Sequence, residues 1–180
     1  MVYLVAAVVL LAGVAVINLL LTIGVIGRLR DHAAALKSMQ DSSPGFALSP
    51  GDQIPDFVAE DLDHRLVSRE SIAGREALMG FFSASCRACE IQLPEFLQAA
   101  DAMRRQEAEV VAVVSGSGDE QASLVEKLRQ SVRVIPESEY GPVTSTMEVR
   151  GFPVFYHWTP DGVLVSAAHD VRRLVAPTPA

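Results

Sequence analysis

The sequence lacks several features that would assign it to a specialised class of protein. Its 12 glycines and 10 prolines among 180 residues are too few for a collagen-like or low-complexity chain. Charged residues make up only 21% of the chain, which is too few for a disordered one, so we expect it to fold. The net charge is -7 and the chain contains no basic stripe, which argues against nucleic acid as a partner.

Charge is missing altogether from the N-terminal segment. No Asp, Glu, Lys, Arg or His occurs from residue 2 to residue 27. As a helix, Val2–Ile26 would extend about 37 Å at ~1.5 Å per residue, enough to cross a hydrocarbon core of about 30 Å. The run is too long for a cleaved signal peptide and has no basic start. We therefore predict a single-pass membrane anchor at residues 2–27 that contacts the lipid bilayer, with a buried core helix as the alternative.

The residues after the predicted anchor bear on its orientation. Arg28, Arg30 and Lys37 follow it closely, so the positive-inside rule favours a cytoplasmic location for the rest of the chain. Helix-like spacing up to residue 40 then gives way to short stretches rich in Ser, Pro and Gly. We interpret residues 28–51 as a stalk and linker.

Strand-like and helix-like segments alternate from residue 52 onward. Continuous apolar runs predict buried strands, and apolar residues at helical spacing predict helices. The predicted strands are 57–59, 66–68, 77–82, 110–114, 132–135, 154–158 and 163–167, and the predicted helices are 90–106 and 121–130, with a helical turn near 71–72. This order predicts an α/β domain with a mixed central sheet over residues 52–175, followed by a tail at 176–180.

Cysteine is almost absent, and both cysteines lie in the tetrapeptide Cys86-Arg87-Ala88-Cys89, between a predicted strand and a predicted helix. A spacing of three on a first helical turn lets the two sulfurs approach bonding distance. The helix N-terminus and Arg87 both favour a thiolate, so we expect Cys86 to be the more acidic thiol and the nucleophile. Cys89, one turn further along and more covered, is then the resolving thiol.

The cysteine pair has three alternative uses. A tetrahedral zinc site would need two more ligands, and none of the four histidines (His32, His64, His157 and His169) is paired at ligand spacing. A purely structural disulfide across two residues would restrict the unfolded chain little. A copper(I) carrier that uses the two thiolates and a histidine such as His157 is an alternative. We expect no metal and no cofactor in the redox reaction itself.

The tract from Phe81 to Cys89, followed by Pro94, resembles the thioredoxin superfamily and, within it, the membrane-anchored TlpA-like thiol:disulfide oxidoreductases. More loosely, it is similar to accessory proteins of methylamine dehydrogenase maturation. The resemblance covers residues 52–174 and implies a thioredoxin-like fold and an enzyme that exchanges its disulfide with protein thiols or disulfides. It also implies a membrane or soluble electron donor and an extracytoplasmic redox domain, which conflicts with the basic residues after the anchor.

The resemblance also implies roles for residues outside the cysteine pair. Gly151-Phe152-Pro153 looks like the family's cis-proline loop. A cis Pro153 would leave the backbone of Phe152 free to pair with an extended substrate. The usual closing helix would be short, because little sequence follows Asp170.

The sequence departs from related families at four positions. The residue before the first cysteine is commonly Trp, and here it is Ser85. The buried acid of thioredoxins, six residues before the first cysteine, is replaced by Gly80, so the proton acceptor for the resolving thiol is not evident. Glu90 is a candidate for that role, and we expect Arg87 and Glu90 to modulate the thiols. Met79 and Ser83 stand where peroxiredoxins have Pro and Thr, which makes a peroxiredoxin-like peroxidase the weaker reading.

Overall fold

The protein is described from a computed structural model that defines residues 1, 13 and 47–175. The chain divides into two compact units, residues 1–44 and residues 45–180, and all the elements below belong to the second unit. The predicted tail and, apart from Gly13, the predicted anchor lie outside the described residues. Among the residues that are described, no helix has the length and apolar character needed to cross a membrane.

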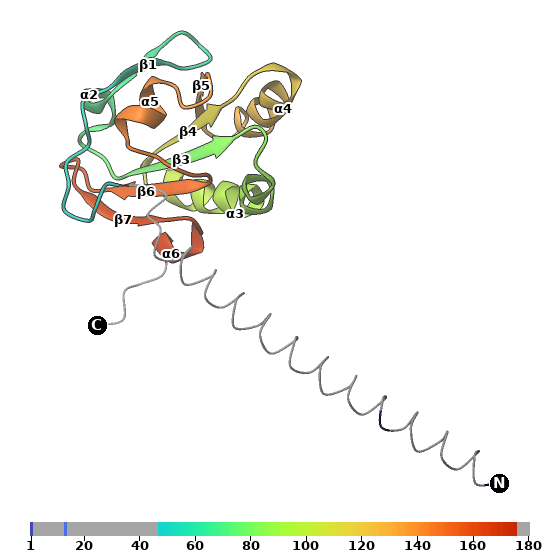
Figure 1. The fold of residues 1–180 in the computed structure, drawn as a ribbon. Coiled ribbons are helices and arrows are strands. Elements are labelled where there is room, and N and C mark those ends of the chain that lie inside the picture. Colours follow the sequence, from blue (N-terminus) through green and yellow to red (C-terminus); the bar gives the residue numbers. More distant parts are fainter. Residues whose placement is uncertain (2–12, 14–46, 176–180) are drawn as a thin grey trace. The chain divides into compact units, whose positions relative to one another are not determined.

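A five-stranded sheet with the order β5-β4-β3-β6-β7 forms the centre of the second unit (Figure 1). The strands β3 (Ala77–Ser83), β4 (Glu109–Ser115) and β5 (Arg133–Glu137) are parallel. The strands β6 (Val154–Trp158) and β7 (Leu164–Ala168) form an antiparallel hairpin, and β6 runs antiparallel to β3. The fold is therefore thioredoxin-like α/β with a mixed sheet, which confirms that part of the prediction.

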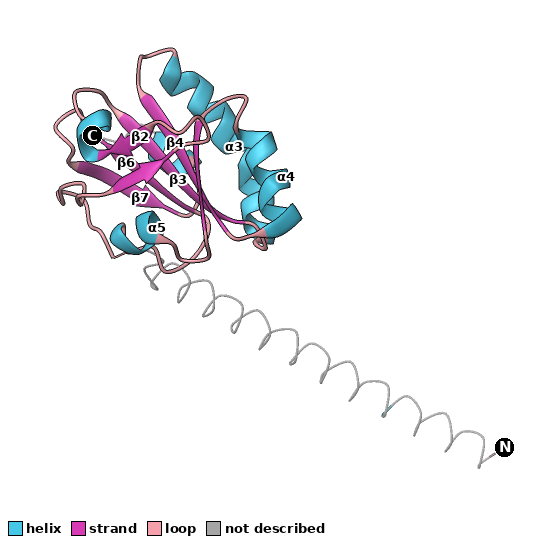
Figure 2. Cartoon of the chain, turned by 90° about the horizontal axis from the view of Figure 1, so that it is seen from above, coloured by secondary structure: helices cyan, strands magenta, loops and turns pink. Residues whose placement is uncertain are grey.

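Helices and a small hairpin cover the two faces of this sheet (Figure 2). Side chains of α3, α4 and the segment that includes α6 belong to the core on one face, while α2 and α5 contribute to the core on the other. The helices are α2 (Arg69–Ile72), α3 (Arg87–Arg104), α4 (Gly118–Leu128), α5 (Pro142–Thr146) and α6 (Arg172–Val175), and the hairpin strands are β1 (Val58–Glu60) and β2 (Leu66–Ser68).

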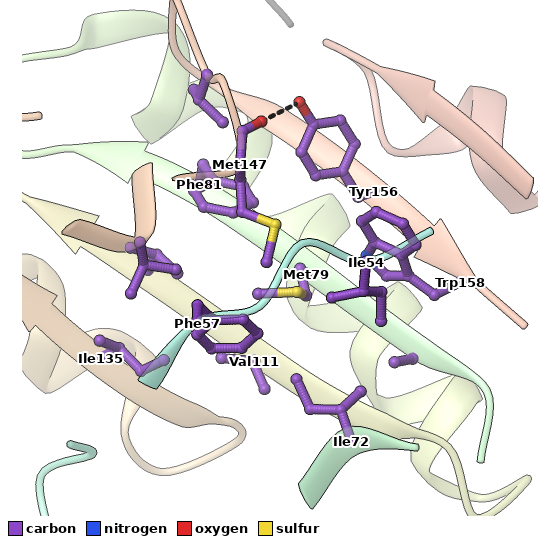
Figure 3. Close-up of a cluster of buried hydrophobic side chains, with 14 of the residues drawn as sticks. Ile54, Phe57, Ile72, Met79, Phe81, Val111, Ile135, Met147, Tyr156 and Trp158 are labelled. Carbon is purple, nitrogen blue, oxygen red and sulfur yellow. Dashed lines mark hydrogen bonds between the residues drawn. The ribbon is translucent and has the colours of Figure 1, made fainter. Parts of the chain in front are cut away.

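Alternation along β3 supplies both cores, because successive strand residues point to opposite faces. Met79 and Phe81 enter the core that contains Tyr156 and Trp158 (Figure 3). The Tyr156 hydroxyl donates a hydrogen bond to the backbone oxygen of Met147 at 3.1 Å, and burial raises the pKa of this phenol. Residues of β3 with even numbers face α3 instead.

The observed elements differ from the predicted ones mainly at their ends. Helix α3 begins at Arg87 instead of residue 90, because Cys86 is its N-cap. Helix α5 was not predicted: it has only five residues and two threonines, so it shows no helical periodicity. The folded unit also reaches into the segment predicted as linker, since Leu48 packs against the core and the Gly51 N–H donates to the Leu164 oxygen. The closing helix α6 is short, as expected.

Candidate active site

The two cysteines lie where β3 ends and α3 begins. After Ser83 the chain turns, and the Cys86 N–H donates to the Ser83 oxygen at 3.1 Å. Cys86 has the extended backbone of an N-cap residue, whereas Cys89 lies in the first turn of the helix. Their Cα atoms are 5.3 Å apart and their sulfurs are joined in a disulfide. The structure therefore brings the two sulfurs together, as the spacing predicts.

The two sulfurs differ sharply in access to solvent. Cys89 is only 1% exposed and belongs to an apolar cluster that also contains Leu93 and Phe96. Cys86 is partly exposed. A thiolate arriving from solvent can therefore reach the disulfide far more readily at Cys86 than at Cys89.

The start of α3 provides hydrogen bonds to Cys86. The Cys89 N–H donates to Cys86 Sγ at 3.1 Å. This N–H is one of the first in an 18-residue helix, where unpaired donors and the helix dipole favour negative charge. In the dithiol state the same groups would stabilise a thiolate on Cys86. Arg87, the first helical residue, is exposed and adds a cation beside it.

The loop before β6 reaches the same site from far along the chain. The Phe152–Pro153 peptide bond is cis, as the resemblance implies. The backbone oxygen of Phe152 lies 3.5 Å from Cys86 Sγ, although 66 residues separate the two in sequence. On the far side of this loop, the Pro153 oxygen is 2.6 Å from Nδ1 of His169. Of the six predicted site residues, the structure thus places Phe152 and Pro153 directly beside the cysteine pair.

A cavity of about 620 Å³ opens beside the disulfide, between the start of α3 and α4. Both cysteines line it, together with the predicted modulating residues Arg87 and Glu90. Its α4 side carries three charged residues, Asp119, Glu120 and Lys127. The space next to the cysteines is therefore polar on the α4 side. Glu90 is exposed there and remains a candidate proton acceptor.

Gly80 explains why the site has no buried acid at the position that thioredoxins use. A Cβ atom at Gly80 would lie 2.7 Å from Cε2 of Phe96 and 2.9 Å from Cε2 of Phe82. Contacts this short do not occur between packed atoms, so even a methyl group would displace a ring. Aromatic side chains occupy the space that an acid would need.

The structure corrects the suggestion that His157 could be a copper ligand. His157 pairs with Leu78 near the start of β3, whereas Cys86 follows Ser83 at the opposite end. At ~3.3 Å per residue, these two positions on β3 are roughly 16 Å apart. Within residues 47–175, no group of three or more His, Cys, Asp or Glu side chains could hold a metal ion. The histidine was proposed from residue type alone, and the strand register excludes it.

One residue near the site was not identified from the sequence. The ring of Tyr140 lies 5.6 Å from the ring of Phe152, measured between centroids, and Tyr140 is 50% exposed. It precedes the short helix α5, in a segment without periodicity. The only available signal was a large aromatic residue among polar neighbours, which does not indicate what the ring contacts.

Comparisons with known proteins agree with this architecture. The model of the AhpC/TSA family matches residues 50–153, more than half of the chain. A comparison with curated protein sequences finds no match. The chain is also similar to solved structures at about 20% sequence identity, and similarity at this level establishes the fold alone.

Three solved structures illustrate that likeness. The thioredoxin domain of a thiol-disulfide oxidoreductase from Bacteroides vulgatus has 20% identity and a TM-score of 0.61, covering 72% of this chain and 100% of that one. A secreted Mycobacterium tuberculosis disulfide oxidoreductase homologous to E. coli DsbE has 20% identity and a TM-score of 0.55, covering 64% of this chain and 84% of that one. A thiol:disulfide interchange protein from Bacteroides sp. has 21% identity and a TM-score of 0.60, covering 71% of this chain and 88% of that one.

Proposed function

The chain belongs to the AhpC/TSA family of thioredoxin-like proteins, and on that premise we propose that it is a thiol:disulfide oxidoreductase whose Cys86–Cys89 pair exchanges electrons with protein thiols or disulfides. The observation that carries the proposal is the unequal exposure of the two sulfurs. Cys86 is partly exposed and its sulfur accepts a hydrogen bond from the Cys89 N–H, while Cys89 is 1% exposed. An accessible cysteine whose thiolate is stabilised by the helix N-terminus suits a nucleophile, and the buried cysteine beside it suits a resolving thiol.

The reaction follows from this arrangement. To oxidise a client, a client thiolate attacks Cys86 Sγ, the Cys86–Cys89 bond breaks, and Cys89 leaves as a thiolate that takes up a proton. A second client thiolate then attacks the client sulfur of the mixed disulfide, which releases Cys86 as a thiolate. Two electrons pass from the client to the cysteine pair, and the client leaves with a disulfide. The reduction of a client disulfide is the reverse sequence.

Three features next to Cys86 support the individual steps. The Cys89 N–H and the N-terminus of α3 stabilise negative charge on Cys86 whenever it is the leaving group or the attacking group. The cis-proline loop leaves the Phe152 oxygen beside Cys86, where an extended client backbone could pair with it. Arg87 and Glu90 line the adjacent cavity and would modulate the charge near the thiols.

We also propose that residues 2–27 tether this domain to the cell membrane, with the redox domain outside the cytoplasm. The uncharged run and the TlpA-like resemblance support this arrangement, while Arg28, Arg30 and Lys37 favour the opposite side. In an oxidising compartment the pair would require a membrane or soluble electron donor to be reduced. A reporter enzyme that works only outside the cytoplasm is fused after Ala180, and a second fusion carries one that works only inside. Activity of the first fusion alone supports this topology, and activity of the second alone reverses it.

Trapping of the covalent intermediate tests the proposed activity. In a Cys89→Ser chain, the mixed disulfide between Cys86 and a client cannot be resolved, so adducts should accumulate and disappear on reduction. The matched Cys86→Ser chain should form none, because Cys89 is buried. Non-reducing electrophoresis and mass spectrometry detect the adducts. If no adduct forms and copper(I) instead binds stoichiometrically through the two thiolates, the carrier reading replaces ours.

A further inference from the structure

Tyr140 combines exposure with an unusual backbone. It is 50% exposed, and its φ of 49° lies in the left-handed region that favours glycine. A bulky aromatic residue is uncommon there and costs conformational free energy. Such a residue persists only where its surroundings hold it in place. Since half of the Tyr140 side chain faces solvent, packing against the core explains only part of why a tyrosine occupies this position.

The surroundings of Tyr140 hold the loop from both sides. The Ser145 hydroxyl donates to the Tyr140 oxygen at 2.8 Å, and the Gly141 N–H donates to the Ser138 oxygen at 2.9 Å. The carboxylate of Glu137 accepts the N–H groups of Val143 at 2.9 Å and of Thr144 at 3.0 Å. The ring is thus presented to solvent from a fixed loop.

Phe152 lies between the Tyr140 ring and the reacting sulfur of Cys86. The Tyr140 and Phe152 rings are 5.6 Å apart, and the Phe152 oxygen is 3.5 Å from Cys86 Sγ. When a client is joined to Cys86 through its own cysteine, the Cα atoms of the adjacent client residues lie about 3.8 Å from the Cα atom of that cysteine. An adjacent side chain of the client therefore falls within reach of the two rings.

We infer that Tyr140 and Phe152 form an aromatic site that binds a large apolar side chain next to the client's reacting cysteine, and that this site selects among clients of the proposed exchange reaction. The cavity on the α4 side of the cysteine pair suits an apolar side chain less well, because Asp119, Glu120 and Lys127 line it. Offset or edge contacts between aromatic rings add binding free energy beyond the buried area. Clients with a small residue beside the cysteine would lose that contribution.

Two reduced peptides probe this selectivity against the oxidised full chain, Gly-Phe-Cys-Phe-Gly and Gly-Ala-Cys-Ala-Gly. In each reaction two peptide thiols lose two electrons to the Cys86–Cys89 disulfide and leave as one peptide disulfide, and two protons pass to the enzyme thiols and solvent. The rate is followed by alkylation of the new enzyme thiols. We expect the wild type to react roughly three- to tenfold faster with the phenylalanine peptide.

Substitutions at Tyr140 assign the preference to the ring. Tyr140→Asn removes the ring but tolerates a positive φ, so its unfolding midpoint should be no lower than that of the wild type, while the preference disappears. Tyr140→Phe should retain the preference. Leu66→Ala removes an exposed apolar side chain of the separate β1-β2 hairpin and should change nothing.

The outcomes separate this inference from the activity on which it rests. If neither peptide reduces the wild-type disulfide, the proposed function fails. If both peptides reduce it at equal rates, or if Tyr140→Asn keeps the preference, the exchange reaction stands and the aromatic site is refuted. Equal rates in the wild type are decisive even if a variant folds poorly.

Discussion

Replacement of Gly80 by alanine tests how tightly β3 packs against α3, the helix that Cys86 caps and that contains Cys89. The added Cβ would lie 2.7 Å from the Phe96 ring and 2.9 Å from the Phe82 ring. The Phe96 ring has no free space to move into, since it is fully buried, stacks on Phe155 at 5.6 Å and meets Phe82 edge-on at 5.0 Å. The methyl group must therefore displace packed rings.

The sign of the effect follows from two opposing magnitudes. Overpacking of a filled core costs about 1–3 kcal/mol. Alanine also reduces the conformational freedom of the unfolded chain relative to glycine, which returns about 0.5–1 kcal/mol. We expect a net loss of about 1–2 kcal/mol and a fall in the unfolding midpoint of about 3–8 °C for a domain of this size.

Urea denaturation measures this loss, and Trp158 reports it, because it is the only tryptophan and is fully buried. Phe96→Leu replaces the obstructing ring by a smaller side chain. The loss of stability in the Gly80→Ala/Phe96→Leu double variant should therefore be smaller, by about 1 kcal/mol, than the sum of the losses in the two single variants. Additive losses, or a Gly80→Ala protein within about 0.5 kcal/mol of the wild type, would refute the packing argument.

Two further predictions concern the thiols and the end of the chain. Stabilisation of the Cys86 thiolate by the Cys89 N–H also stabilises the dithiol form. Equilibration with glutathione buffers should therefore give a reduction potential less reducing than about -270 mV, and a potential at or below that value would contradict this stabilisation. Hydrogen bonds from Arg172, at 2.7 Å and 3.0 Å, hold the pKa of Asp170 below its usual range. Above pH about 4, the free energy of unfolding of the wild type should therefore exceed that of Asp170→Asn by ~0.2–1 kcal/mol. This difference should vanish as the pH falls through the lowered pKa of Asp170. A difference that persists in strong acid would rule out the carboxylate as its source.

Much of the fold could be predicted because buried parallel strands are continuous apolar runs. The strand predicted at 77–82 is observed as Ala77–Ser83, and the strand predicted at 110–114 as Glu109–Ser115. The helix start was placed three residues late, because Cys86 is an uncommon N-cap that does not signal a helix as Ser or Asp would.

Contacts between distant segments could not be predicted in the same way. The approach of Phe152 to Cys86 spans 66 residues and depends on how β3 and β6 pair. The same register carries His157 to the opposite end of β3, which no property of the histidine itself indicates. The aromatic site went unnoticed because Tyr140 lies in an aperiodic loop whose shape depends on a positive φ and on hydrogen bonds to α5. The cis proline could be expected only from the resemblance.

The distinct roles of the two cysteines are tested most directly by alkylation of the dithiol form. Limiting iodoacetamide, applied across a range of pH and followed by peptide mass spectrometry, measures the reactivity of each thiol separately. We expect Cys86 to react at least about tenfold faster than Cys89, with a pH midpoint below the ordinary thiol value of about 8.5. Faster or equal labelling of Cys89, or a Cys86 midpoint at or above that value, would contradict the assignment of Cys86 as the nucleophile.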